Sequence, residues 1–369
     1  MRVLHVAESA QGGVGTYLAE MLPYQARRLG IDHVRALLPD RHAAHVSGVD
    51  RRSVESWRRR GRSLLALLTL GIALVREVRR FRPTVIHAHS SFAGALVRLI
   101  YGWRRVPFRI VYCPHGWGFD RKSAGWKRWL VARVERALSG LCDRIVVISD
   151  HERRQGIGAG IAEQRMTLVL NGIADIAPAR PARWDDPRIK VLFVGRLDHQ
   201  KGFDTLLDAV EPLGGRLSVR VIGEAIVGRS GTRRAAGSIE TLGWRSLAEV
   251  AAEIAAADVV VIPSRWEGFG LVAIEAMRGG RAVVASTVGG LREIVVDGET
   301  GRLVSPDMPE RLAHVLQQVG RDEWHAMGRA GRARYLARFT ADRMNDELIQ
   351  LYEALGSDIP ALYRTVARG

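Results

Sequence analysis

Short apolar runs alternate with longer amphipathic segments along the whole chain. Apolar runs bounded by glycine or polar residues are typical of buried parallel strands, and apolar positions three or four apart predict helices. Strands are expected over residues 2–7, 33–38, 84–89, 108–113, 144–148, 166–170, 189–194, 217–222, 238–242, 258–262, 282–285 and 302–304. Helices are expected from about residue 14 and over residues 63–81, 92–102, 124–139, 150–158, 201–210, 246–256, 270–278, 289–295 and 307–318. This alternation predicts an α/β protein with parallel sheets covered on both faces.

A proline-rich segment divides the chain. Residues 177–187 contain three prolines and no hydrophobic periodicity, which is typical of an interdomain linker. A chain of 369 residues is long enough for two or three domains with full cores. We therefore expect one domain over residues 1–176, a second over residues 188–345, and a helical segment over residues 346–369.

The excess of positive charge lies entirely in the first half. Residues 1–180 contain 30 Lys and Arg against 14 Asp and Glu, whereas residues 181–369 contain 25 of each kind. A basic half suits an anionic membrane, a lipid phosphate or nucleic acid, and a GC-rich genome also enriches arginine. No helix-turn-helix, zinc-finger or base-stacking signature accompanies the charge. We therefore favour contact with an anionic membrane and expect no nucleic-acid partner.

Arginines flank one apolar segment of this basic half. Residues 63–75 are uncharged, but thirteen residues are too few to span a bilayer, which needs about 20. An interfacial helix and a core helix both fit, and we favour a core helix whose flanking arginines contact lipid headgroups.

The two cysteines, Cys113 and Cys142, form no metal or redox motif, and residues 1–7 read as a strand rather than a signal peptide. We expect a cytoplasmic protein, peripheral on the inner membrane face.

The most informative segment is Ser264–Glu275, which follows an apolar strand. It contains Glu267 and Glu275, eight residues apart, separated by Gly268, Phe269 and Gly270 and the start of a helical pattern. A strand, a glycine turn and a helix start direct free backbone N–H groups at an anion. Carboxylates would repel that anion, so the two glutamates are expected to accept hydrogen bonds from hydroxyl groups. Phosphate and hydroxyls together indicate a nucleotide sugar.

Two further loops follow predicted strands. Gly12 and Gly13 form a glycine loop before the first helix, where the backbone can approach a diphosphate, although a simple tight turn also explains them. Gly195 precedes Arg196 and Lys201, and a guanidinium fork with an ammonium group suits a diphosphate leaving group.

Histidines end two strands of the first half. His115 follows the strand that ends at Cys113, where α/β sheets bind their ligands. A lone histidine there is more often structural. His89 ends the preceding strand, and contact with an acceptor and a hydrogen-bonded place in the core are both open readings.

Residues 264–275 resemble the Glu-x7-Glu signature of the retaining glycosyltransferases of family 4, which have GT-B architecture. The resemblance implies two Rossmann-like domains facing across a cleft, with residues 346–369 returning to the first domain. It implies that Glu267 contacts the donor sugar and Glu275 the ribose. Donor contacts are also implied for a wider set: Gly12, Gly13, Gly195, Arg196, Lys201, Phe269, Gly270, Leu271 and Val272. His115 is implied to lie against the donor sugar, which makes His115, Glu267, Arg196 and Lys201 the expected catalytic residues.

The implied reaction moves a hexosyl unit from a UDP- or GDP-sugar to an acceptor hydroxyl on a lipid-linked oligosaccharide in cell-surface polysaccharide synthesis. No Asp-x-Asp pair occurs in the sequence, so we expect neither a metal nor another cofactor. With Glu275 on the ribose, same-face attack is expected rather than a double displacement through Glu267. Two alternatives stay open at this point: a nucleotide-sugar epimerase of the same architecture, and a basic nucleic-acid-binding protein.

Overall fold

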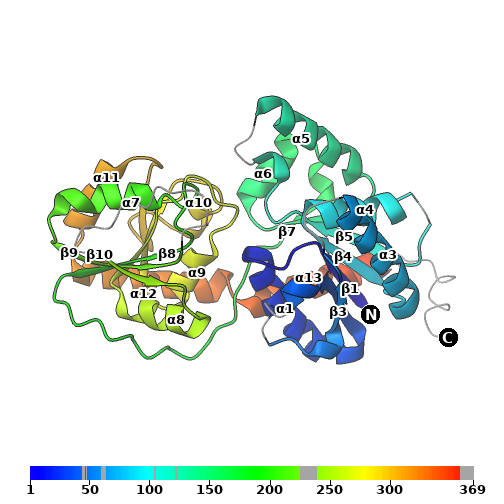
Figure 1. The fold of residues 1–369 in the computed structure, drawn as a ribbon, viewed down its shortest axis with the longest axis horizontal. Coiled ribbons are helices and arrows are strands. Elements are labelled where there is room, and N and C mark those ends of the chain that lie inside the picture. The colour runs from blue at the N-terminus through cyan, green and yellow to red at the C-terminus, as the bar shows by residue number, and fades with distance from the viewer. Residues whose placement is uncertain are drawn as a thin grey trace. The chain divides into compact units, whose positions relative to one another are not determined.

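The computed structural model describes residues 1–43, 46, 48–59, 64–103, 105–120, 124–224 and 239–357. The chain divides into two compact units (Figure 1). The first comprises Met1–Ala174 with Ala341–Gly369, and the second comprises Asp175–Thr340. Residues 358–369 of the predicted C-terminal segment lie outside the described residues.

The first unit is built on a parallel sheet. Its described strands follow the order β3-β2-β1-β4-β5-β6-β7, so the chain starts in the middle and winds outward in both directions. All neighbouring pairs are parallel. The strands are β1 (Val3–Ala7), β2 (Val34–Pro39), β3 (Val54–Trp57), β4 (Val85–His89), β5 (Arg109–Cys113), β6 (Arg144–Val147) and β7 (Met166–Leu168).

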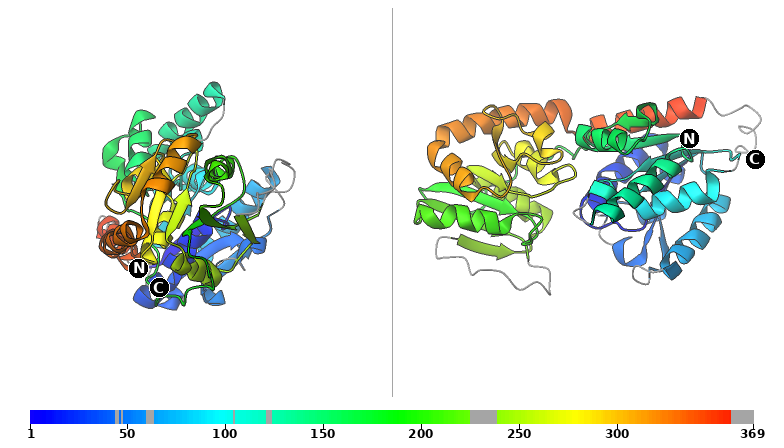
Figure 2. Two further views of the ribbon diagram at one scale, coloured as in Figure 1. Left: turned by 90° about the vertical axis from the view of Figure 1, so that its left-hand side faces the viewer. Right: turned by 90° about the horizontal axis from the view of Figure 1, so that it is seen from above.

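Helices cover both faces of this sheet (Figures 1 and 2). α1 (Gly13–Leu29) and α13 (Ala341–Ser357) pack together on one face. α3 (Leu64–Phe81), α4 (Ser91–Tyr101) and α5 (Gly125–Ser139) cover the other, followed by α6 (Asp150–Gly158). Side chains alternate along β1 and β4. Leu4 and Ile86 therefore join the core beneath α3 and α4, while His5 and His87 point to the opposite face.

The helix predicted over residues 63–81 is amphipathic. Leu70 and Leu74 are fully buried against the sheet, as expected for a core helix. On the opposite side Leu68 is 62% exposed and Ile72 is 71% exposed. Over the described residues, no helix combines the length and apolar character needed to cross a membrane.

The second unit repeats the same class of fold. Its described strands are parallel in the order β10-β9-β8-β11-β12-β13. They are β8 (Ile189–Val194), β9 (Leu217–Ile222), β10 (Ile239–Gly243), β11 (Val259–Ile262), β12 (Ala282–Ser286) and β13 (Gly301–Val304). α7 (Phe203–Val210) and α11 (Pro309–Gln318) cover one face, and α8 (Leu247–Ala256), α9 (Leu271–Arg278) and α12 (Arg321–Arg338) cover the other (Figure 1). The two parallel-sheet units confirm the predicted fold class.

Three of the strands and α-helices were not expected from the sequence: β3, the four-residue helix α2 (Asp40–Ala43) and α12. α12 is rich in arginine and contains Gly328 and Gly331, which weaken a helical pattern. Both glycines lie at close packing contacts. A Cβ on Gly328 would lie 2.2 Å from the carbonyl oxygen of Gly280, and one on Gly331 would lie 3.2 Å from Met277 Cγ. The glycines therefore allow α12 to pack tightly against α9 and the turn after it.

Part of the predicted linker packs on the second unit. The Trp184 side chain is buried, and its indole N–H donates to Ser218 Oγ on β9 at 2.8 Å. The Ala182 N–H donates to the carbonyl of Ala252 on α8 at 2.9 Å. The buried tryptophan and the two hydrogen bonds attach this part of the segment to the second unit.

Candidate functional site

Two loops of the second unit meet at the carboxyl ends of β8 and β11. A Cβ on Gly202 would lie 1.9 Å from the carbonyl oxygen of Pro263, so only glycine permits this approach. The Arg265 N–H donates to the Gln200 carbonyl at 2.9 Å. The Gln200 side-chain amide donates to the Trp266 carbonyl at 3.3 Å. The predicted cationic loop and the predicted glutamate loop are therefore fixed side by side.

Lys201 and Glu267 form an ion pair between these loops. Lys201 Nζ lies 2.5 Å from Glu267 Oε2. The two side chains are only 21% and 14% exposed, so their attraction is less screened than in a surface pair. The site also depends on a third loop, after β12. There a Cβ on Gly289 would lie 1.7 Å from the carbonyl oxygen of Glu267.

Glu275 lies in the same site, on α9. Desolvation is the largest influence on its carboxyl group and raises the pKa, while the charges of Arg278 and Lys201 partly lower it. Lys201 therefore acts electrostatically on both predicted glutamates. Among the described residues, the Glu275 carboxylate has no hydrogen-bonding partner. It is a partly buried acceptor that is free to bind hydroxyl donors.

The start of α9 lies between the two glutamates. Gly270 is its N-cap, with φ 111°, and no side chain caps the helix. The first-turn N–H groups of Leu271 and Val272, both partly exposed, carry the positive end of the helix dipole. Phe269 is buried, with its ring edge-on to Phe339 at 6.1 Å between centroids. Phe269 thus anchors the turn, and its side chain faces the core.

Arg196 is held within its own loop. Its guanidinium Nη2 donates to Gln200 Oε1 at 2.6 Å and lies 3.2 Å from Asp198 Oδ2. The side chain is 47% exposed. The preceding Gly195 N–H donates to the Ile222 carbonyl at 3.0 Å. Of the predicted donor residues in this unit, Lys201, Glu267, Glu275 and the α9 start therefore converge, and Arg196 extends from the same loop as Lys201.

The predicted glycine loop of the first unit begins α1. Gly12 has φ 59° and is the N-cap, without a side-chain hydrogen bond, and Gly13 is the first helical residue. Both glycines are exposed, and a Cβ on Gly12 would contact nothing within 4 Å. The left-handed φ of Gly12, rather than tight packing, explains glycine there.

His115 lies in a strained loop after β5, with φ 53°. The loop is held by Glu152 of α6, a buried residue that no sequence motif indicated. The Gly116 N–H donates to Glu152 Oε1 at 2.5 Å, and the Ile148 N–H donates to Glu152 Oε2 at 2.7 Å. Burial raises the pKa of Glu152 to about 7, partly offset by these two bonds. Since Glu152 follows the N-cap Ser149, the sequence reads as a simple helix cap.

His89 is fully buried, and both of its ring nitrogens have partners. Nε2 lies 3.2 Å from His5 Nδ1, and Nδ1 lies 3.0 Å from His115 Nε2. This agrees with the hydrogen-bonded core position among the two readings left open. The ring offers no free nitrogen to an acceptor in this conformation. His5 and Gln25, which complete the network, gave no signal because neither lies in a recognisable motif.

Two family models match the chain. One, described as glycosyl transferase 4-like domain, matches residues 12–172. The other, described as glycosyl transferases group 1, matches residues 188–322.

Curated relatives agree with these matches. An uncharacterized 41.2 kDa protein in the cps region of Klebsiella pneumoniae is 28% identical, over 96% of this chain and 100% of that protein. The D-inositol 3-phosphate glycosyltransferase of Geodermatophilus obscurus is 31% identical, over 80% of this chain and 73% of that enzyme.

Solved structures share the fold. HepE of Anabaena, in complex with UDP, superposes with a TM-score of 0.81 at 20% identity, covering 96% of this chain and 100% of that one. Sucrose-phosphate synthase of Thermosynechococcus elongatus superposes with a TM-score of 0.83 at 22% identity, covering 97% and 100%. The chain belongs to the glycosyltransferases of GT-B architecture and is similar to those of family 4.

Proposed function

We propose that this enzyme transfers a hexosyl unit, with retention of configuration and without a metal ion, from a UDP- or GDP-sugar to a hydroxyl of a lipid-linked oligosaccharide. The product would enter cell-surface polysaccharide synthesis. The observation that carries the proposal is the position of Lys201, 2.5 Å from Glu267 and electrostatically coupled to Glu275. One cation thus serves two carboxylates beside an uncapped helix start.

The three charges suit the parts of a nucleotide sugar. A diphosphate entering at the α9 start would compete with Glu267 for the Lys201 ammonium group. Glu267 would then accept hydrogen bonds from sugar hydroxyls. Glu275 has no hydrogen-bonding partner within the described part of the chain, and its two oxygens suit the two ribose hydroxyls. Each carboxylate would exchange a partner or solvent for a hydroxyl donor.

Departure of the nucleoside diphosphate requires stabilisation of developing negative charge. We assign this role to Lys201, Arg196 and the N–H groups at the start of α9. Because these groups supply positive charge and no Asp-x-Asp pair is available, we propose that no divalent metal is needed. The acceptor would attack the face of the sugar that the leaving phosphate occupies, and that phosphate would take the acceptor proton. His115 would orient the sugar, and the Gly12–Gly13 loop would contact the phosphates.

The relatives support the donor and the pathway class. HepE has been solved with UDP, with UDP and glucose, and with UDP-glucose. The Klebsiella pneumoniae relative is encoded in a cps region. A nucleoside diphosphate sugar as donor and a surface polysaccharide as destination follow by analogy for this chain.

The donor site is tested with Lys201→Met and Glu275→Gln. Binding of UDP and GDP to the full chain is measured by calorimetry, with Glu310→Gln on the exposed side of α11 as a matched control. We expect each site variant to weaken the better nucleotide at least about tenfold, since each loses a charge-assisted hydrogen bond. Unchanged affinity in both site variants would refute the assignment.

Retention and metal independence need separate measurements. Proton NMR of the first product anomer should show the same configuration as the donor, and an inverted anomer excludes same-face attack. Turnover should be unchanged after treatment with EDTA. Conversion of the donor without any acceptor would instead identify an epimerase.

We also propose that the first unit binds the anionic inner membrane surface through α3 and α4. An open groove of about 1230 Å³ runs between these helices, lined by Leu68, Ile72 and Ile100 and bordered by Arg76 and Arg79. Exposed apolar side chains continue along the same helical layer on α4, in the turn after it and on α5, at Phe92, Leu99, Trp103, Trp126 and Trp129. Apolar groups beside arginines suit acyl chains and phosphate headgroups respectively.

Vesicle sedimentation tests this surface. The full chain should pellet with vesicles containing phosphatidylglycerol, less at high salt, and not with pure phosphatidylcholine. Leu68→Glu should lower the bound fraction, whereas Leu336→Glu, at an exposed leucine of α12, should not. Equal binding by the two variants, or no dependence on anionic lipid, would contradict the membrane contact.

A further inference from the structure

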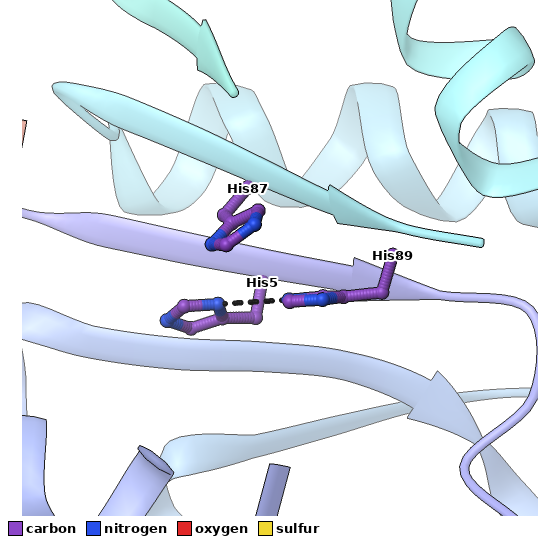
Figure 3. Close-up of side chains that lie close together, drawn as sticks. All are labelled: His5, His87 and His89. Atoms are coloured by element: carbon purple, nitrogen blue, oxygen red, sulfur yellow. Dashed lines mark hydrogen bonds between the residues drawn. The ribbon is translucent and has the colours of Figure 1, made fainter. Parts of the chain in front are cut away.

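Three buried histidines lie together beneath α1. His5 comes from β1, and His87 and His89 come from β4 (Figure 3). All three side chains are fully buried. They meet because β1 and β4 pair in register, with His5 opposite His87, and because alternate residues of a strand point to the same face.

Hydrogen bonds connect this cluster to His115. The Gln25 amide oxygen, on α1, lies 2.9 Å from His5 Nε2. His5 Nδ1 lies 3.2 Å from His89 Nε2, as drawn in Figure 3. His89 Nδ1 lies 3.0 Å from His115 Nε2. Four side chains from α1, β1, β4 and the loop after β5 thus form a single chain of hydrogen bonds.

The proton positions in this chain follow from its first member. The amide oxygen of Gln25 can only accept, so His5 must carry its proton on Nε2. In a neutral imidazole the other nitrogen then accepts, so His5 Nδ1 accepts from His89 Nε2–H. The same step repeats once more, and His89 Nδ1 accepts from His115 Nε2–H. All three rings are therefore protonated on Nε2.

This proton assignment holds for neutral rings, and burial keeps the rings neutral. Desolvation lowers the pKa of His5 to about 4, partly offset by the bond to Gln25, and lowers the pKa of His115 to about 3. Desolvation also lowers the pKa of His89, with smaller effects from the neighbouring histidines. Above pH 6 each ring has one donor and one acceptor.

The chain leaves His115 with a defined outer nitrogen. His115 is only partly buried, and its Nδ1 has no partner among the described residues. With the proton held on Nε2, Nδ1 presents a lone pair. A lone pair accepts a hydrogen bond from a hydroxyl group, which is the chemistry of a sugar.

A metal ion is the competing occupant of this cluster. His5, His87 and His89 each offer a nitrogen, and these atoms lie within 4.8 Å of one another. A divalent ion would need both His5 Nδ1 and His89 Nε2 as lone pairs, whereas these atoms share one proton in a hydrogen bond. In addition, no carboxylate of the described chain bonds to these rings, so two buried positive charges would be uncompensated.

We propose that Gln25, His5 and His89 act as positioning residues that hold His115 in its Nε2-protonated tautomer, so that Nδ1 accepts a hydrogen bond from a hydroxyl of the donor sugar. The inference rests on the proposed function for the role of His115 at the sugar. The tautomer itself is a property of the free protein. The tautomer of His115 and the role of His115 at the sugar can therefore be refuted separately.

The matched test compares His5→Phe with His87→Phe in the full chain. Both residues are fully buried on the same face of the sheet, but His87 Nδ1 pairs with the Tyr352 hydroxyl at 2.6 Å and stands outside the chain. Nitrogen-15 NMR of histidine-labelled protein should show His89 and His115 protonated on Nε2 in the wild type and in His87→Phe. In His5→Phe both rings should populate a mixture of tautomers, because His89 Nε2–H loses its acceptor, His5 Nδ1.

Turnover provides the second readout. His5→Phe should lower kcat about three- to tenfold with little change in KM for the donor, the loss expected from one misdirected hydrogen bond. His87→Phe should keep kcat within about twofold. Equal effects of the two variants on kcat and on the tautomers would reduce the chain to a structural role and overturn the proposal.

Two further outcomes are decisive. One equivalent of zinc bound to the wild type and lost in His5→Phe would replace the hydrogen-bond chain by a metal site. If instead the wild-type rings show the expected tautomers but His115→Phe turns over normally, the chain stands and the catalytic role of His115 in the proposed function fails.

Discussion

The buried histidines should make the first unit sensitive to mild acid. His5 and His115 have pKa values lowered to about 4 and about 3 by desolvation, against about 6.5 in an unfolded chain. Between these values the unfolded chain binds more protons than the folded one, so stability rises with pH through this range. The contribution is complete above pH 6.5 and is lost as the pH falls toward 4.

The size of this change in the free energy of unfolding follows from the difference between the pKa values of the folded and unfolded chains. At pH 5 each of these two histidines should lower the free energy of unfolding by about 2 kcal/mol relative to pH 7.5, together about 4 kcal/mol. His87 and His89, also lowered by desolvation, act in the same direction. Glu152 has the opposite effect on the pH dependence of stability.

The Glu152 carboxyl, with its pKa raised to about 7, favours folding when protonated. Its contribution is present below pH 4.5 and lost as the pH rises through 7. Acidification to pH 5 therefore raises the Glu152 contribution to the free energy of unfolding by about 2 kcal/mol. The histidine effect is larger. Since domains are stable by about 5–15 kcal/mol, the net loss should be readily measurable.

Hydrogen exchange by mass spectrometry, corrected for intrinsic rates, can assign this loss to one unit. At pH 5 peptides from β1, β4 and α1 should lose protection relative to pH 7.5, and peptides from β8 and β11 should not. His5→Phe should remove about 2 kcal/mol of the pH dependence of the free energy of unfolding, measured in urea. Equal protection at both pH values, or the same pH dependence in His5→Phe and the wild type, would refute the reasoning.

Two other substitutions test a close backbone contact at the donor site and a buried ion pair between α4 and α5. Gly289→Ala should weaken nucleotide binding at least about tenfold, because its Cβ would lie 1.7 Å from the Glu267 carbonyl oxygen. Gly320→Ala, whose Cβ would contact nothing within 4 Å, should leave the affinity unchanged. Equal affinities of the two variants in calorimetry would contradict this prediction. Glu135→Ala leaves Arg98 buried without its ion pair and should lower the free energy of unfolding by about 3–5 kcal/mol, and a urea midpoint like that of the wild type would show the pair to be dispensable.

Hydrophobic periodicity predicted most elements of both sheets because strand and helix periods depend on local sequence. It failed for α12, whose glycines disfavour a helix and are explained only by contact with residues about fifty positions earlier in the chain. It also missed β3, a short edge strand of four residues. Tertiary packing decides such elements, and a single sequence carries little signal for it.

The site shows the same division. The sequence indicated Glu267, Glu275 and Lys201 because Glu267 and Lys201 lie in loops with recognisable chemistry and Glu275 lies on the helix that continues the same motif. Gln25 and Glu152 were missed because they are single polar residues on ordinary helices, and only the fold reveals what their side chains contact. His89 was ambiguous for the same reason, since burial separates a ligand contact from a core hydrogen bond.

The most direct test of the central claim is calorimetric titration of UDP and GDP into the wild type, Lys201→Met and Glu275→Gln. We expect one nucleotide to bind the wild type with 1:1 stoichiometry and both substitutions to weaken this binding at least about tenfold. Failure of both nucleotides to bind, or equal affinity in all three proteins, would contradict the assignment of this site.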